Sequence, residues 1–196
     1  MFMIHRRHPR PNVVVSPKAN GALPAREPFA RDLAIQAVLD PGIRAVEYCH
    51  RVVHGGRVVD AGSLVVDRPD GRFLLDPACA HRSRGAADTE TLDAGLEERG
   101  IRRIELAADA ASREPRRGNA RAIWSRRDFP VSHRIRSRIL DALDELGPLT
   151  IAELESDIPL PTEVAASAFR LICDDLLETD LDAAPLGPST MVRIRR

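Results

Sequence analysis

The side chains with the clearest potential for chemistry lie in the stretch GRVVDAGSLVVDRPDGRFLLDPA, residues 56–78, which carries Asp60 and Asp76. Asp60 stands in an alternating apolar segment and Asp76 ends a short apolar one, so both side chains can project from neighbouring strands. Two carboxylates brought together in this way can hold a divalent cation. The competing interpretation is an ordinary hairpin whose acids face solvent.

Other reactive side chains lack the companions that a site needs. Cys49 and His50 point to opposite sides of a predicted strand, and no second pair has the spacing of a zinc site. Cys79 and His81 closely follow Asp76 and form a weaker candidate for completing a site around it. No serine has a histidine and an aspartate at motif spacing, so nucleophilic catalysis is not indicated.

The elements that must position these residues follow the order helix, three strands, helix, strand. The first helix follows Glu27, has Pro28 in its first turn, and ends at Asp40-Pro41-Gly42. The remaining predicted elements are strands over 46–53, 57–66 and 72–76, a helix over 88–100 and a strand over 101–106. Tight turns between the first three strands, and a crossover helix before the last, indicate an α/β protein with a mixed sheet.

The rest of the chain has a different composition. Residues 1–26, rich in proline and basic side chains, are expected to form a flexible basic arm. Residues 107–131 have the composition of an arginine-rich linker, which Trp124, the only tryptophan, is expected to dock onto a domain. Residues 132–196 contain three helical segments and a terminal hairpin, a pattern typical of a winged-helix domain. The two folded domains would then be 27–106 and 132–196.

Charge is distributed in blocks, although 29 basic and 29 acidic side chains cancel. Residues 113–138 carry nine arginines, whereas residues 139–182 carry twelve acids and one base, Arg170. Blocks of this kind can present one face to a polyanion and another to a different partner. The arginines expected to contact double-stranded DNA are Arg116, Arg117, Arg121, Arg126, Arg127, Arg134, Arg136, Arg138, Arg193, Arg195 and Arg196. The second and third helices of the winged-helix segment are acidic, so we expect them to bind a protein partner or to pack on the arginine-rich linker.

The segments EPFARDLAIQAVLDPGIRAVEY, GRVVDAGSLVV and GRFLLDPA resemble the TnsA-type transposon endonucleases and, more widely, the restriction-endonuclease-like PD-(D/E)xK fold. The resemblance implies a restriction-endonuclease-like mixed sheet core followed by a winged-helix domain. It places the helix glutamate of the family at Glu27 and its second-strand acid at Asp76. Gly62 stands where the family has a first-strand aspartate, and Ala78 stands where it has a lysine.

The departures from the family pattern decide what chemistry is expected. Gly62 supplies no metal ligand and Ala78 supplies no charge, so the site is expected to be degenerate. The only lysine in the chain is Lys18, which leaves Arg82 or Arg84 as a source of positive charge.

A shift of register offers an enzyme alternative. Asp60 has the same side-chain parity as the glycine two residues later, so Asp60 and Asp76 could face one site. In that hypothesis Glu27, Asp60 and Asp76 are the catalytic residues of a metal-dependent DNA endonuclease, and Asp60 and Asp76 hold Mg²⁺.

The favoured expectation is a DNA-binding accessory or regulatory protein without a cofactor, whose nuclease-like domain is inactive. It would act in a mobile-element or transcription complex. The alternatives are the divergent endonuclease and a protein-interaction adaptor. No apolar run approaches the roughly 18 residues of a membrane helix, so a cytoplasmic protein without a membrane partner is expected.

Overall fold

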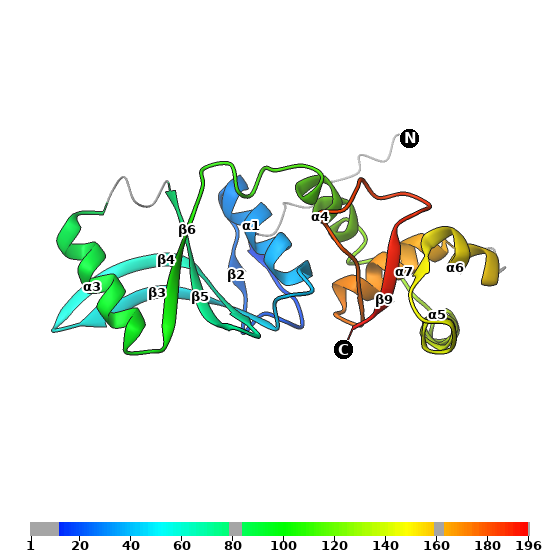
Figure 1. The fold of residues 1–196 in the computed structure, drawn as a ribbon, viewed down its shortest axis with the longest axis horizontal. Coiled ribbons are helices and arrows are strands. Elements are labelled where there is room, and N and C mark those ends of the chain that lie inside the picture. Colours follow the sequence, from blue (N-terminus) through cyan, green and yellow to red (C-terminus); the bar gives the residue numbers. More distant parts are fainter. Residues whose placement is uncertain (1–11, 79–83, 159–162, 196) are drawn as a thin grey trace, which may run out of the picture.

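The computed structural model describes residues 12–78, 84–158 and 163–195. Its elements form an elongated molecule, with a mixed sheet at one end, a group of helices at the other and further helices between them (Figure 1). The predicted mixed α/β class is confirmed. None of the helices within these ranges is both long enough and apolar enough to cross a lipid bilayer.

A four-stranded sheet in the order β3-β4-β5-β6 forms the first part of the molecule. Its strands are β3 (Ala45–His54), β4 (Arg57–Arg68), β5 (Gly71–Pro77) and β6 (Ile101–Leu106). The first three are antiparallel neighbours, whereas β6 runs parallel to β5 because helix α3 (Ala86–Glu97) crosses over between them. The mixed sheet that the sequence predicts is therefore observed.

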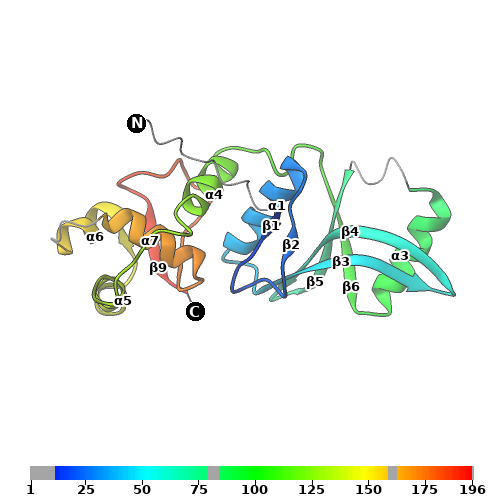
Figure 2. The same cartoon turned by 180° about the vertical axis from the view of Figure 1, so that it is seen from behind.

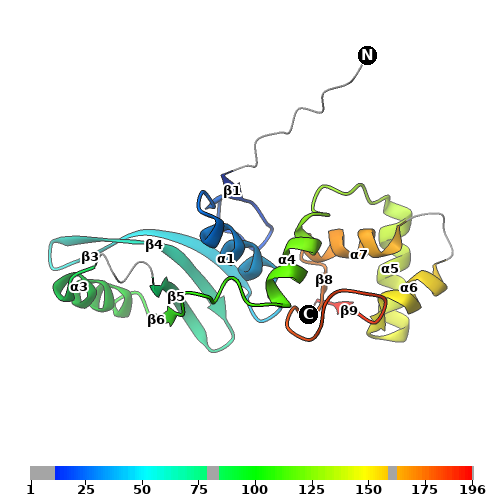
Figure 3. The same ribbon diagram turned by 90° about the horizontal axis from the view of Figure 1, so that it is seen from above.

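Helices cover both faces of this sheet, and alternate residues of a strand face one or the other (Figure 3). Phe73 and Leu75 of β5 belong to the core cluster that includes helix α1 (Pro28–Leu39), while Leu74 belongs to the cluster beneath α3. Asp76 follows Leu74 by two residues on the strand, so both side chains point to the same face of the sheet. Its side chain therefore faces α3, on the opposite side of the sheet from α1.

Residues 12–26 differ from the flexible arm that their composition predicts. They form two short paired strands, β1 (Val13–Val14) and β2 (Leu23–Pro24), which pack against α1. Val14 and Leu23 are completely buried. Burial of these aliphatic side chains in the main core holds the segment in place, although it has no helical period. The first eleven residues of the expected arm lie outside the described part of the chain.

The segment expected to be a linker contains a packed helix, α4 (Arg116–Trp124). Ile123 is completely buried and Trp124 is 6% exposed, so the tryptophan docks as expected. Helix α4 contacts α1 on one side and helix α7 (Val164–Cys173) on the other. One core cluster therefore continues from the sheet through α1 and α4 to the C-terminal helices.

The C-terminal part consists of three helices and a small antiparallel sheet in the order β7-β9-β8. Its other elements are α5 (His133–Leu146), β7 (Leu149–Thr150), α6 (Ile151–Asp157), β8 (Leu177–Glu178) and β9 (Met191–Ile194). Ser132 caps α5, and Thr150 and Glu153 form a capping box at the start of α6. Helix α7 ends at Cys173, and Asp175 then adopts a left-handed φ of +60° in the turn before β8.

Candidate functional site

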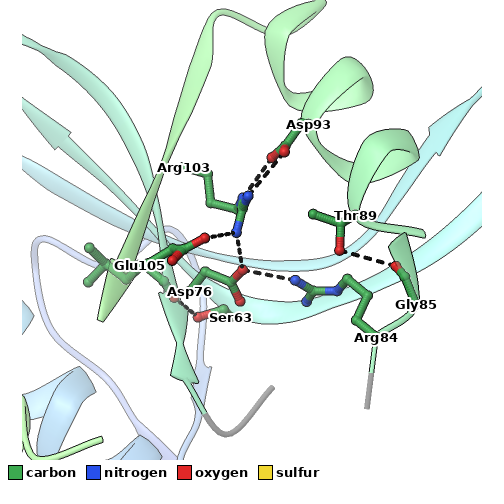
Figure 4. Close-up of polar contacts among 9 residues, drawn as sticks. Ser63, Asp76, Arg84, Gly85, Thr89, Asp93, Arg103 and Glu105 are labelled. Atoms are coloured by element: carbon green, nitrogen blue, oxygen red, sulfur yellow. Dashed lines mark hydrogen bonds and ion pairs between the residues drawn. The ribbon is translucent and has the colours of Figure 1, made fainter. Parts of the chain in front are cut away.

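A buried cluster of arginines and carboxylates surrounds Asp76 at the end of β5 (Figure 4). The Asp76 side chain is fully buried, and its Oδ2 accepts hydrogen bonds from Nη1 of Arg84 at 2.8 Å and Nη1 of Arg103 at 3.2 Å. The Arg84 side chain is itself only 6% exposed. A carboxylate held by two guanidinium groups is compensated within the protein, which is how a buried charge is tolerated.

Arg103 connects this cluster to helix α3 and to its own strand. Its Nε and Nη2 atoms donate to the two carboxylate oxygens of Asp93 at 2.6 and 3.0 Å, and Nη1 also donates to Glu105 at 2.8 Å. Hydrogen bonding to Asp93 raises the pKa of Arg103 above its ordinary value. The guanidinium stays charged and occupies the point at which three carboxylates converge.

The crossover from β5 through α3 to β6 brings these distant residues together. The parallel register pairs Asp76 with Glu105 and Leu74 with Arg103, so all four side chains face α3. Asp93 lies on α3 above them. The sequence interpretation missed Asp93, Arg103 and Glu105. The alternation of Arg103 and Glu105 in IRRIEL was the available signal, since it placed opposite charges on one face of a strand.

A β-bulge in β4 decides which residue lies beside Asp76. The pairing of β3 with β4 shifts between Asp60 and Ser63, and Gly62 adopts a φ of +56°, a conformation that favours glycine. Ser63 is buried and its Oγ donates a hydrogen bond to the carbonyl of Leu75. A serine hydroxyl thus lies next to Asp76, one residue beyond the glycine to which the family resemblance points (Figure 4).

The structure does not bring together the three acids of the endonuclease hypothesis. The Asp60 side chain is 82% exposed and pairs with Arg51 at 3.1 Å. Glu27 precedes α1, on the opposite side of the sheet from Asp76. The donor set therefore does not fit Mg²⁺ held between Asp60 and Asp76. Within the three described ranges, no group of three or more His, Cys, Asp or Glu side chains could hold a metal ion. The candidates outside these ranges are Cys79, His81, Arg82 and Arg196.

Most of the arginines expected to contact DNA form ion pairs within the chain. The paired ones are Arg116, Arg117, Arg121, Arg126, Arg127, Arg193 and Arg195. Arg134, Arg136 and Arg138 remain at the start of α5, where they are exposed and form no ion pair with another described residue. Among the described arginines of this set, those without an ion pair therefore all lie on α5.

Ion pairs and hydrogen bonds hold α4 against both of its neighbours. Asp32 of α1 is 5% exposed and accepts from Nε of Arg117 at 2.9 Å and Nε of Arg121 at 2.8 Å. Asn119, which is 3% exposed, donates from Nδ2 to the carbonyl of Leu181 at 2.9 Å, in the loop between β8 and β9. This loop would be the wing of a winged-helix domain, and here it is bound to α4.

The only lysine of the chain lies inside the molecule. Lys18 is 5% exposed, and its Nζ donates to the Asp40 carbonyl at 2.7 Å and pairs with Asp175 at 3.3 Å. Burial lowers the pKa of Lys18, although Asp175 opposes this effect. The residue joins the N-terminal segment to the C-terminal part, and it lies in neither the Asp76 cluster nor an exposed basic face.

The acidic face expected on the second and third C-terminal helices is smaller than its sequence suggests. Ser167 of α7 is completely buried, Asp174 pairs with Arg170 at 2.9 Å, and Asp175 pairs with Arg195 at 2.9 Å. Several acids on α6 and on the second half of α5 are exposed and form no ion pair with another described residue. They are Asp141, Asp144, Glu145, Glu155 and Asp157.

No protein-family model matches this sequence, and no curated protein aligns with it significantly. The geometry of the Asp76 cluster and of the charged helices therefore carries the functional interpretation.

Proposed function

We propose that this chain is a non-hydrolytic accessory protein, in which a nuclease-like core and a winged-helix module act by binding rather than by cleavage. The observation that carries the proposal is the arginine-filled cluster at Asp76. A metal-dependent nuclease must present carboxylates to its cation. Here Arg84 and Arg103 compensate the buried Asp76 carboxylate, and Ser63 lies beside it.

The chemistry of a guanidinium explains why this cluster would not replace a metal ion. An arginine stays protonated in proteins and offers hydrogen-bond donors alone, so it cannot bind a water molecule as a Lewis acid and turn it into a metal-bound hydroxide. The two arginines thus satisfy the charge of Asp76 without supplying a nucleophile. We infer that the cluster stabilises the fold of the core.

Incubation of supercoiled plasmid with the protein and Mg²⁺ or Mn²⁺ should produce no nicking, because no metal-activated water is available. The matched variant Asp76→Asn should be equally inactive. Either cation should also leave the melting temperature of the wild type unchanged, since a cation that binds the native state would raise it. Metal-dependent nicking by the wild type, abolished in Asp76→Asn, would contradict the proposal and favour the endonuclease alternative.

In this proposal the C-terminal module binds the partner, through helices α5 and α6. In DNA readers built on helix-turn-helix folds, the recognition helix enters the major groove. Here α7 is packed against α4 and α5, and the loop before β9 is bound by Asn119. We therefore place a protein partner on α5 and α6. The setting in a mobile-element or transcription complex follows from the resemblance to transposon endonucleases and is part of the proposal.

Duplex DNA is a second candidate partner, favoured by the exposed and unpaired Arg134, Arg136 and Arg138. Such arginines would contact phosphates, which gives affinity without sequence preference. The contact surface would be much smaller than the eleven arginines of the sequence-based expectation.

Replacing these three arginines by glutamine should weaken any gel shift of duplex DNA. It should also make the slope of the logarithm of the binding constant against the logarithm of the salt concentration less steep, by about 0.9 for each phosphate that is no longer neutralised. The control replaces Arg51 and Arg57 by glutamine, which should leave the shift unchanged because these exposed arginines belong to the sheet and already pair with Asp60 and Asp88. A shift that is insensitive to the α5 variant, or absent from the wild type, would remove DNA from the candidates.

A further inference from the structure

Helix α5 carries its charges in the order opposite to the one that its backbone dipole favours. Its basic side chains, all in the first half, are His133, Arg134, Arg136 and Arg138, and its acidic side chains, all in the second half, are Asp141, Asp144 and Glu145. The N-terminus of a helix is positive and favours acids, and the C-terminus favours bases. This order is therefore unfavourable for an isolated α5, and no described residue forms an ion pair with these side chains to offset it.

Four of these charges form a straight stripe on the outer side of the helix. Arg134, Arg138, Asp141 and Glu145 are spaced by four, three and four residues, which places them on one face. The buried residues of the helix, which lie about a third of a turn away from this stripe, are Ile135, Ile139, Ala142 and Leu143. Helix α5 is seen end-on at the margin of the C-terminal part (Figure 1, Figure 2), and all four side chains of the stripe are exposed.

The stripe is complementary to itself under a two-fold rotation. Arg134 and Glu145 lie equally far from the peptide bond between Ile139 and Leu140, and so do Arg138 and Asp141. Two antiparallel copies centred on this bond would bring every charge of the stripe opposite a charge of the other sign. Their helix dipoles would also oppose each other, so the C-terminal end of each helix would lie beside the basic half of the other and offset the unfavourable order of charges.

We propose that α5 is the contact surface for a second copy of this chain, which packs antiparallel to it in a symmetric dimer. Arg134 of each copy faces Glu145 of the other, and Arg138 faces Asp141. A two-fold interface of this type uses the same patch on both subunits. Because the stripe consists of exposed charges, the association is steered electrostatically and weakens with salt.

The order of charges favours a second copy over DNA as the occupant of this face. A phosphate backbone is uniformly negative and would meet Asp141 and Glu145 on the same stripe as Arg134 and Arg138, so half of the contacts would be repulsive. A second copy satisfies all four charges. This interface goes beyond the non-hydrolytic role, and neither proposal depends on the other.

A charge-swap experiment tests the interface in the full chain. The first variant carries Arg134→Glu and Arg138→Glu, which makes the stripe acidic, and the second carries Asp141→Arg and Glu145→Arg, which makes it basic. We expect the wild type to dimerise in sedimentation velocity at low salt and to dissociate at high salt. Each variant alone should dimerise about a hundredfold more weakly or not at all, because like charges face each other. An equimolar mixture of the two variants should restore the dimer.

The other outcomes would overturn the interface. A wild type that stays monomeric up to hundreds of micromolar at low salt has no such contact. Variants that dimerise as well as the wild type would place any dimer on another surface. A monomeric wild type that binds duplex DNA, with binding lost in the first variant, would assign the stripe to DNA. Circular dichroism should show that both variants fold, since all four positions are exposed. The plasmid assay tests the non-hydrolytic proposal separately.

Discussion

Replacing Asp76 by alanine should lower the free energy of unfolding by about 3 to 5 kcal/mol, the usual result of removing one partner of a buried ion pair. The cost arises chiefly at Arg84, whose side chain is 6% exposed and would lose the carboxylate that compensates it. Arg103 keeps Asp93 and Glu105 as partners. Urea denaturation measures the effect, and an unchanged m-value would show that the transition itself is the same.

Two further variants separate the lost ion pair from a general effect of mutation in this region. Glu105→Ala removes an ion pair to the same Arg103, but the Glu105 side chain is 66% exposed, so the cost should stay below about 1 kcal/mol. Adding Arg84→Met to Asp76→Leu replaces the pair by apolar side chains and should recover much of the stability lost in Asp76→Ala. If Asp76→Ala cost no more than Glu105→Ala, the cluster would not support the core.

The secondary structure of the core could be predicted because its signals are local. The Pro28 start of α1, the turn at Asp70-Gly71 and the helix before β6 all depend on a few neighbouring residues. The packing of residues 12–26 could not be predicted, because the contacts that hold these residues are not local. Lys18 binds the carbonyl of Asp40, which lies 22 residues further along the chain.

The arginine blocks misled the interpretation for the same physical reason. A run of arginines in the sequence suggests a positive face, but an ion pair depends on which carboxylate is near in space. Arg117 forms an ion pair with Asp32, which lies 85 residues earlier in the chain, and Arg116 forms one with Asp182, which lies 66 residues later. No local sequence pattern predicts that these two carboxylates are the partners of the arginines. Of the described arginines in the expected set, only those of the α5 block are exposed and have no described carboxylate partner.

The Asp76 cluster was only half predictable from the sequence. The sequence-based interpretation included the second-strand acid at Asp76, and it named Arg84 only as one of two arginines that could supply the charge of the missing lysine. The first-strand position did not, because the bulge at Gly62 places Ser63 there and a one-residue shift leaves no trace in the apolar pattern. Asp93 was not recognised because it lies on a charged helix whose orientation only the crossover fixes.

Replacing Ile123 by alanine should lower the free energy of unfolding by about 3 kcal/mol, because the side chain is completely buried in the core shared by both ends of the molecule. Ile123→Val, the conservative control, should cost about 1 kcal/mol. A residue in a loosely docked linker would instead change stability by less than about 0.5 kcal/mol. Thermal or urea unfolding should therefore show one cooperative transition in the wild type, because α4 belongs to the common core.

Cys173 of α7 provides a second, local measurement of the same packing between α4 and α7. Its Sγ donates to the carbonyl of Ile123 at 3.5 Å, and burial raises its pKa to about 12. The thiol should therefore react slowly with alkylating reagents at neutral pH. The reaction is followed in a Cys49→Ser and Cys79→Ser background, so that Cys173 is the only thiol. If α4 and α7 separate only when the whole chain unfolds, Ile123→Ala should speed the reaction by the same factor by which it raises the equilibrium constant for global unfolding. A larger increase would mean that α4 separates from α7 while the sheet stays folded, so that the two ends of the molecule would be distinct cooperative units despite their shared core.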